Sequence, residues 1–218
     1  MGIKFFVSFF KKIRRITLIL TIFGILLFLV LTFLAGFLYP GDYDYFGYYF
    51  SDLGAITARN GESNSISRTL YVVAFTIIAV AFIPFWISIR SLFDESNKEK
   101  NLSTLGSIFG VLSSPCMIGV ALFPMDVYLD IHFSLVLVFV TFFILASLLY
   151  SIAIILNRKY SNYFGIIAFI LLVISLVASA SSFTDPNAIL GAFLQKLATY
   201  GFILWTIIPM YLGWCKLP

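Results

Sequence analysis

Six long apolar segments, separated by polar ones, set the strongest limit on how this chain can fold. A helix needs roughly 20 predominantly apolar residues to cross a hydrocarbon core about 30 Å thick. The segments that reach this length cover about residues 16–38, 69–93, 102–123, 131–156, 163–183 and 188–212. They are continuous, whereas the strands of a membrane barrel alternate apolar and polar residues in short stretches. The sequence therefore predicts an all-α polytopic integral membrane protein, a single bundle of six transmembrane helices over residues 1–218.

The composition supports this class of protein. Hydrophobic residues make up 61% of the chain and charged residues 11%, and the mean hydropathy is +1.03. A soluble domain is about 45–50% apolar and about 25% charged. The basic residues cluster beside the apolar segments, so the net charge of +4 does not indicate a nucleic-acid partner. The first apolar run exceeds the roughly 7–15 residues of a signal-peptide core, and we interpret it as a retained helix.

The lysines and arginines predict how the bundle is oriented. With six spans both termini lie on the same side of the membrane, and basic residues favour the cytoplasmic side. Of the 14 lysines and arginines, 11 fall on the side of the termini, and the other side holds only Arg59, Arg68 and Lys196. We therefore expect a cell-membrane protein with cytoplasmic N- and C-termini and with the long loop of residues 39–68 on the outer side.

Residues 39–55, YPGDYDYFGYYFSDLGA, combine aromatic and acidic side chains within this loop. Because tyrosine favours the headgroup level, one interpretation is an aromatic belt along the outer leaflet. Asp52 stands between aromatic and apolar residues, where a carboxylate is costly unless it is paired. It is either a helix cap or turn former, with Gly54 in a left-handed conformation, or a site residue beside Ser51. We predict that the loop covers the outer mouth of the bundle and turns Asp52 toward a polar cavity.

The stretch FPMDVYLDIH, residues 123–132, is the second candidate site. Asp126 and Asp130 are four residues apart, so one helical turn would place both on one face, and His132 is the only histidine. These groups could bind a cation or transfer a proton. The alternative is a capped helix start with His132 hydrogen-bonded inside the bundle. Zinc sites usually need more histidine or cysteine than this chain has, so a divalent cation is the only cofactor for which the sequence leaves room.

Lys196 forms the third candidate site, about two turns into the last span and next to Gln195, while Asp185 caps the start of that span. A lysine at this depth either snorkels to the interface or pairs with an acid in the bundle. We expect Lys196 to point inward and to form an ion pair. Its predicted partners are Asp52, Asp126 or Asp130.

The layout and two short motifs resemble the domain-of-unknown-function 998 family. The residues that carry this resemblance are Ser51, Asp52, Gly54, Phe123, Pro124, Asp126 and His132. The layout is also similar to that of the Frag/DRAM/Sfk membrane proteins, some of which act in lipid remodelling or lipid organisation. The resemblance thus implies a six-helix membrane protein with a role connected to lipids. Ceramidase-like membrane hydrolases use several histidines to bind zinc, so the single histidine disfavours that group.

Three functions fit these residues, and membrane lipids are the expected partners. The preferred one is a lipid-interacting protein whose acidic cavity at the outer membrane face binds a lipid headgroup or a cation. Its predicted ligands are Ser51, Asp52, Asp126, Asp130, His132, Asp185 and Lys196. The alternative is a membrane-embedded enzyme acting on lipid-linked substrates, with catalytic acid–base or cation-binding groups at Asp52, Asp126, Asp130 and His132. An ion-coupled transporter is the second alternative, least favoured because the charged residues do not continue toward the cytoplasmic half of the bundle.

Overall fold

The computed structural model describes residues 2–184 and 189–215, and the side chains of residues 14–180 and 189–215. Its long helices are α1 (Gly2–Phe37), α2 (Ser65–Ile89), α3 (Asn97–Leu122), α4 (Leu129–Leu156), α5 (Asn162–Thr184) and α6 (Ile189–Cys215). Two short 3-10 helices, η1 (Phe50–Gly54) and η2 (Arg90–Leu92), lie in connections. All 6 long helices are long and apolar enough to cross a membrane. The predicted all-α fold is confirmed in this respect, while the orientation of the termini stays a prediction.

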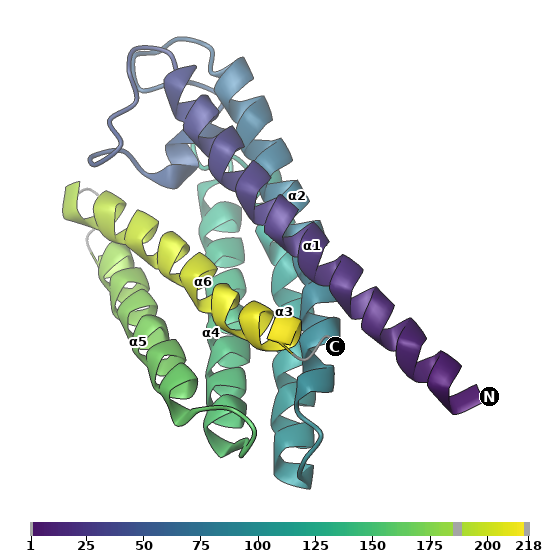
Figure 1. Cartoon of the computed structure of the whole chain (residues 1–218). Coiled ribbons are helices and arrows are strands. Elements are labelled where there is room, and N and C mark those ends of the chain that lie inside the picture. Colours follow the sequence, from purple (N-terminus) through teal and green to yellow (C-terminus); the bar gives the residue numbers. More distant parts are fainter. Residues whose placement is uncertain (1, 185–188, 216–218) are drawn as a thin grey trace.

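The helices pack mainly against their neighbours in sequence. α1 lies along α2, α3 along α4 and α5 along α6, and the contacts of α2 with α3 and of α4 with α5 join these pairs. α6 crosses in front of α4 with few close backbone contacts (Figure 1). Side chains join the two helices, since Phe143 packs on Phe202 and Trp205 Nε1 donates to Ser151 Oγ at 3.1 Å. The connection between α1 and α2 sits at one end of the bundle, and both chain ends lie away from it (Figure 1). The end that carries this connection is called the loop end below.

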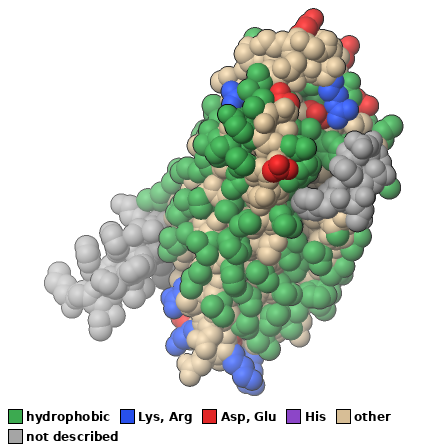
Figure 2. Space-filling view, turned by 180° about the vertical axis from the view of Figure 1, so that it is seen from behind, with side chains coloured by type: hydrophobic (Ala, Val, Ile, Leu, Met, Phe, Trp, Pro, Cys, Tyr) green, Lys and Arg blue, Asp and Glu red, His purple; other side chains and the backbone are tan. Residues whose placement is uncertain are grey.

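The surface is divided along the length of the bundle. Hydrophobic side chains cover the middle of the face shown in Figure 2, with lysines and arginines at the end away from the loop and charged side chains of both signs at the loop end. An apolar band between two polar ends is the surface that a bilayer requires, because lipid offers no partner for polar groups.

Aromatic rings form the centre of the bundle in the half away from the loop. Trp86, Tyr150 and Trp205 are fully buried, and the Trp86 ring stacks on the other two at centroid distances of 5.9 and 5.8 Å. Ser107 Oγ donates to the Trp86 carbonyl at 2.6 Å and lies 2.6 Å from the Tyr150 hydroxyl. Gly110 gives the tryptophan its space, because a Cβ there would lie 2.2 Å from the Trp86 ring. This half is therefore filled by large rings and closely packed helices.

Candidate functional site

Residues 38–64, which we call the lid, form a compact cover over the loop end. Tyr39 and Tyr43 are buried within it, and their rings meet edge to face at a centroid distance of 5.5 Å. The Tyr43 hydroxyl donates to the Tyr49 carbonyl at 2.8 Å. Burial raises the pKa of Tyr39 and of Tyr43, so both hydroxyls stay protonated and act as hydrogen-bonding groups. These tyrosines hold the lid together, whereas Phe46, 68% exposed, is free to meet the headgroup layer as in the aromatic-belt interpretation.

Asp52 lies inside the lid with 4% of its surface exposed. Its Oδ2 atom accepts hydrogen bonds from the Tyr49 backbone N–H at 2.7 Å and from Arg59 Nη2 at 2.8 Å. The first contact closes the start of η1, and the second neutralises the carboxylate. Burial acts to lower the pKa of Arg59, but the hydrogen bond and the charge of Asp52 outweigh it and raise that pKa, so the pair is ionic. The structure thus supports the capping interpretation of Asp52 and adds an ion pair within the lid.

Gly54 does not take the left-handed conformation that the sequence led us to expect. Among the described glycines, only Gly41 (φ 73°) and Gly61 (φ 88°) have a positive φ. Gly54 is required for a different reason, because a Cβ at this position would lie 2.5 Å from the Tyr71 ring. The glycine lets the lid approach α2 closely, and the turn-based expectation was wrong.

Two polar side chains fix the second half of the lid, Asp126 from the bundle and Asn64 from the end of the lid itself. Asp126, in the connection between α3 and α4, accepts the backbone N–H groups of Ile56 and Thr57, each at 2.9 Å. Asn64, just before α2, donates through Nδ2 to the carbonyls of Leu53 and Ala55 at 3.1 and 3.0 Å. The sequence analysis did not single out Asn64, although an asparagine directly before an apolar helix is a recognisable helix-start signal.

The groups predicted to meet at the α3–α4 connection do not converge on one point. Asp130 is exposed in the first turn of α4, where the helix dipole favours a carboxylate. His132 is buried, and its Nδ1 lies 2.8 Å from the Phe123 carbonyl at the end of α3. Since a carbonyl only accepts, Nδ1 carries the hydrogen, as the helix-start interpretation expected. Across the described residues there is no group of three or more histidine, cysteine, aspartate or glutamate side chains placed to hold a metal ion.

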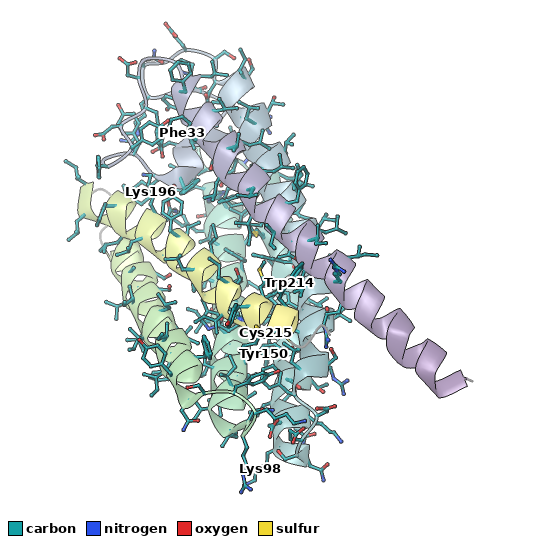
Figure 3. All side chains as sticks on the ribbon, viewed as in Figure 1. Phe33, Lys98, Tyr150, Lys196, Trp214 and Cys215 are labelled. Atoms are coloured by element: carbon teal, nitrogen blue, oxygen red, sulfur yellow. The ribbon has the colours of Figure 1, made fainter. Side chains whose placement is uncertain are left out.

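Lys196 points into the bundle beneath the lid, but it does not meet a carboxylate. The residue is 7% exposed and lies at the loop end of α6 (Figure 3). Its Nζ donates to the Tyr48 carbonyl and lies 5.4 Å from the centre of the Tyr43 ring. Within the described part of the chain, no salt bridge joins Lys196 to an acid, and Asp52 pairs with Arg59. The predicted inward direction was correct and the predicted ion pair was wrong.

A cavity of about 220 Å³ lies beneath the lid, with walls from the long helices and from η1. Most of the lining is apolar and rich in phenylalanine: Phe28, Phe50, Phe75, Phe82, Phe133, Phe139, Phe143 and Phe202. Polar side chains enter it from the lid and from the loop ends of the helices: Tyr49, Ser51, Arg59, His132, Ser179, Gln195 and Thr199. The cavity is therefore amphipathic, with an apolar body and a polar end.

The cavity brings together only part of the predicted site. Ser51 and His132 line it. The predicted residues that do not line it are Asp52, Asp126, Asp130 and Lys196, and Asp185 lies outside the described residues. No carboxylate is among the lining side chains that the structure describes, so the expected acidic character is wrong for this part of the cavity. Arg59 and Gln195 also line the cavity, although neither was predicted to bind a ligand. The sequence could have pointed to Arg59, because it is one of few basic residues on the loop side.

Fold and site together define a multi-pass helical membrane protein with a covered cavity at one end. A family model described as "Protein of unknown function (DUF998)" matches residues 22–210, and the chain belongs to this family. This confirms the resemblance drawn from the SDLGA and FPMD motifs. A search of curated proteins and a search of solved structures found no match.

Proposed function

We propose that this protein holds the acyl chain of a membrane lipid in the cavity beneath the lid, with the lipid head group at the polar end. The single observation that carries the proposal is the lining of the cavity, in which phenylalanines surround the body and polar side chains gather beside the lid. An acyl chain that leaves the bilayer for the cavity exchanges one apolar environment for another. Selectivity would therefore come from packing and from the head group rather than from the hydrophobic effect.

The wall formed by α4 suggests how a lipid enters. Phe133 lines the cavity although it is 41% exposed, and Val136, Phe139 and Val140 are half-buried. α6 crosses α4 in this region with few close backbone contacts, although the rings of Phe143 and Phe202 pack across the crossing at a centroid distance of 4.6 Å (Figure 1). In the proposed mechanism a chain moves sideways from the bilayer between these two helices.

We also propose that the lid lies on the outer side of the cell membrane and the termini in the cytoplasm. The support is the excess of lysine and arginine on the side of the termini. The head group would then be drawn from the outer leaflet.

Lipid binding is preferred over the two other functions because the buried and loop-end carboxylates have structural roles in the lid. Asp52 and Asp126 hold the lid in place and do not line the cavity. An enzyme acting on lipid-linked substrates would need an acid–base pair at the cavity, and among the described lining side chains His132 has no carboxylate beside it, because none lines the cavity. An ion-coupled transporter would need charges continuing toward the other end of the bundle, where the centre is instead filled by rings such as Trp86.

A matched pair of substitutions on α4 tests the proposal. Val140 lines the cavity, whereas Val138, two residues away, is 39% exposed and does not line it. Native mass spectrometry of the protein purified in mild detergent measures how much lipid is bound. Val140→Phe should reduce the co-purified lipid about fivefold or more, since overpacking costs about 1–3 kcal/mol and 1 kcal/mol is a factor of about five. Val138→Phe should leave it unchanged.

Both variants should keep the circular dichroism and the elution volume of the unmodified protein. If the unmodified protein carries no lipid, or if all three proteins carry the same amount, the proposal fails.

A further inference from the structure

The polar end of the cavity is rich in hydrogen-bond donors. Arg59, Ser51 and Gln195 all line it, and the described lining has no carboxylate to receive their hydrogens. Each of these side chains has donor capacity that the described protein does not use. A ligand that accepts hydrogen bonds would therefore match this end of the cavity.

Gln195 is held in one orientation by the lid. Its Oε1 accepts the Phe50 backbone N–H at 2.8 Å. Because a backbone N–H only donates, the oxygen of the amide must face the lid, and the NH₂ group must face elsewhere. No hydrogen bond from this NH₂ group is found within residues 14–180 and 189–215.

The Arg59 guanidinium is likewise held in place, but only part of its hydrogen-bond donors have an acceptor among the described residues. One edge of the guanidinium donates through Nη2 to Asp52 at 2.8 Å, and its Cζ lies 4.3 Å from the centre of the Tyr48 ring. These contacts hold the planar group in place, and the described side chains and backbone offer no acceptor to its Nε and Nη1. A guanidinium presents its donors as a rigid fork that matches a carboxylate or a phosphate.

Ser51 supplies a buried hydroxyl. The residue is 6% exposed and lines the cavity beside Arg59. Its Oγ has no hydrogen-bond partner in the parts of the chain whose side chains are described. Although the residue as a whole is buried, its Oγ is reachable from the cavity, where a ligand could accept its hydrogen.

We propose that Arg59, Ser51 and Gln195 form a receptor for the anionic head group of a lipid, a carboxylate or a phosphate. This inference rests on the proposed function, in which the acyl chain of the same molecule fills the cavity. The guanidinium hydrogens of Arg59 that Asp52 does not use, the serine hydroxyl and the glutamine amide donate to the anion. The site is therefore proposed to bind an anion, whereas the sequence predicted an acidic site that binds a cation.

Matched lipids test the head-group preference. Protein stripped of lipid is incubated in detergent with palmitate against hexadecanol, and with dioleoyl phosphatidate against dioleoylglycerol, and native mass spectrometry measures the bound fraction. Each pair shares its chains and differs in the anion. The anionic member should bind about tenfold more tightly, as expected for charge-assisted hydrogen bonds. A preference in the first pair alone identifies a carboxylate ligand, and one in the second pair alone identifies a phosphate.

Gln195→Glu is the decisive variant, because it keeps an oxygen for the Phe50 N–H and replaces the free NH₂ with an anionic oxygen. It should abolish the preference for the anionic lipid over its neutral partner. Asn60→Asp is the matched control, since Asn60 is exposed, does not line the cavity and uses its own Oδ1 to accept the Glu62 N–H at 3.0 Å. It should keep the full preference.

The outcomes separate the two proposals. Equal binding of the anionic and neutral lipids by the unmodified protein overturns the receptor and leaves the proposed function standing. An equal loss of preference in Gln195→Glu and Asn60→Asp shows an effect of overall charge and also overturns the receptor. Binding of no lipid at all, together with no difference between the Val140→Phe and Val138→Phe proteins, overturns both proposals.

Discussion

The ion pair between Asp52 and Arg59 should control how often the lid opens. Arg59→Gln leaves the Asp52 carboxylate, 4% exposed, with the Tyr49 N–H as its remaining partner among the described residues. Removing one member of a fully buried pair costs about 3–5 kcal/mol. The Arg59 side chain is 45% exposed, however, so water screens the pair and the cost must be reduced. We expect the free energy of local opening to fall by about 1–2 kcal/mol, near the value of one hydrogen bond to a charged group.

Hydrogen exchange measured by mass spectrometry on peptides covering residues 46–57 reports this opening. A loss of about 1–2 kcal/mol should speed exchange there by roughly 5–30-fold. Asp52→Asn keeps an oxygen for the Tyr49 N–H, so the double variant with Arg59→Gln contains no unpaired charge. It should exchange more slowly than the Arg59→Gln single variant, and the double-mutant cycle gives the coupling energy directly.

Two results would refute this reasoning. Strictly additive effects of the two substitutions would show that the charges do not interact. Faster exchange in all helices of Arg59→Gln would show that the pair supports the whole bundle rather than the lid. Salt provides a further control, because the Debye length falls to about 3 Å at 1 M, so salt should weaken lid protection in the unmodified protein more than in the neutral double variant.

Three further perturbations follow from the fold. Asp126→Ala should speed exchange of the two lid amides from which it accepts hydrogen bonds, while substitution of the exposed Asp130 in the first turn of α4 by alanine should not; equal effects would show that Asp126 does not anchor the lid. Gly110→Ala should lower the Tm, because its Cβ would lie 2.2 Å from a buried ring and overpacking costs about 1–3 kcal/mol. Gly119→Ala should lower the Tm less, because its Cβ would meet only flexible leucine tips at 3.0 Å. In a background without the native cysteines, Glu62→Cys should react with an impermeant thiol reagent in intact cells and a cysteine in the α2–α3 connection should not. The reverse result would place the lid in the cytoplasm.

The helices were the predictable part of the structure because a bilayer selects for length and hydropathy, and both can be read locally. The predicted starts differ most at three helices: α1 begins at Gly2 instead of position 16, α3 at Asn97 instead of 102, and α2 at Ser65 instead of 69. The start of α2 is the one that bears on the site. Residues 65–68 are mostly polar, so hydropathy leaves them out. Asn64, buried directly before the helix, uses its side chain to bind lid carbonyls and so ties this first turn to the lid.

The partners of the buried charges were not predictable, because they depend on which segments fold back on one another. Asp52 could pair with Lys196 across the bundle or with Arg59 seven residues away in the same loop. The local pair closes a much shorter loop and so costs less conformational entropy. Because Asp52 is already paired, Lys196 Nζ donates to the Tyr48 carbonyl instead. The cavity was also hidden, since phenylalanines spread over several helices look like ordinary core residues in the sequence.

The anchors of the lid bear on how a lipid would reach the cavity. The lid is bonded to α6 through Gln195, to the α3–α4 connection through Asp126 and to α2 through Ser67, whose Oγ donates to the Leu53 carbonyl. Lifting it would break all of these contacts together, at about 0.5–1.5 kcal/mol for each hydrogen bond. The α4 wall of the cavity contains side chains such as Phe133, which is 41% exposed, and exposed side chains change rotamer on the picosecond to nanosecond timescale. On the proposed function, the lid is therefore a fixed cover that positions Arg59 over the head group, and exchange of lipid takes place through the side of the bundle.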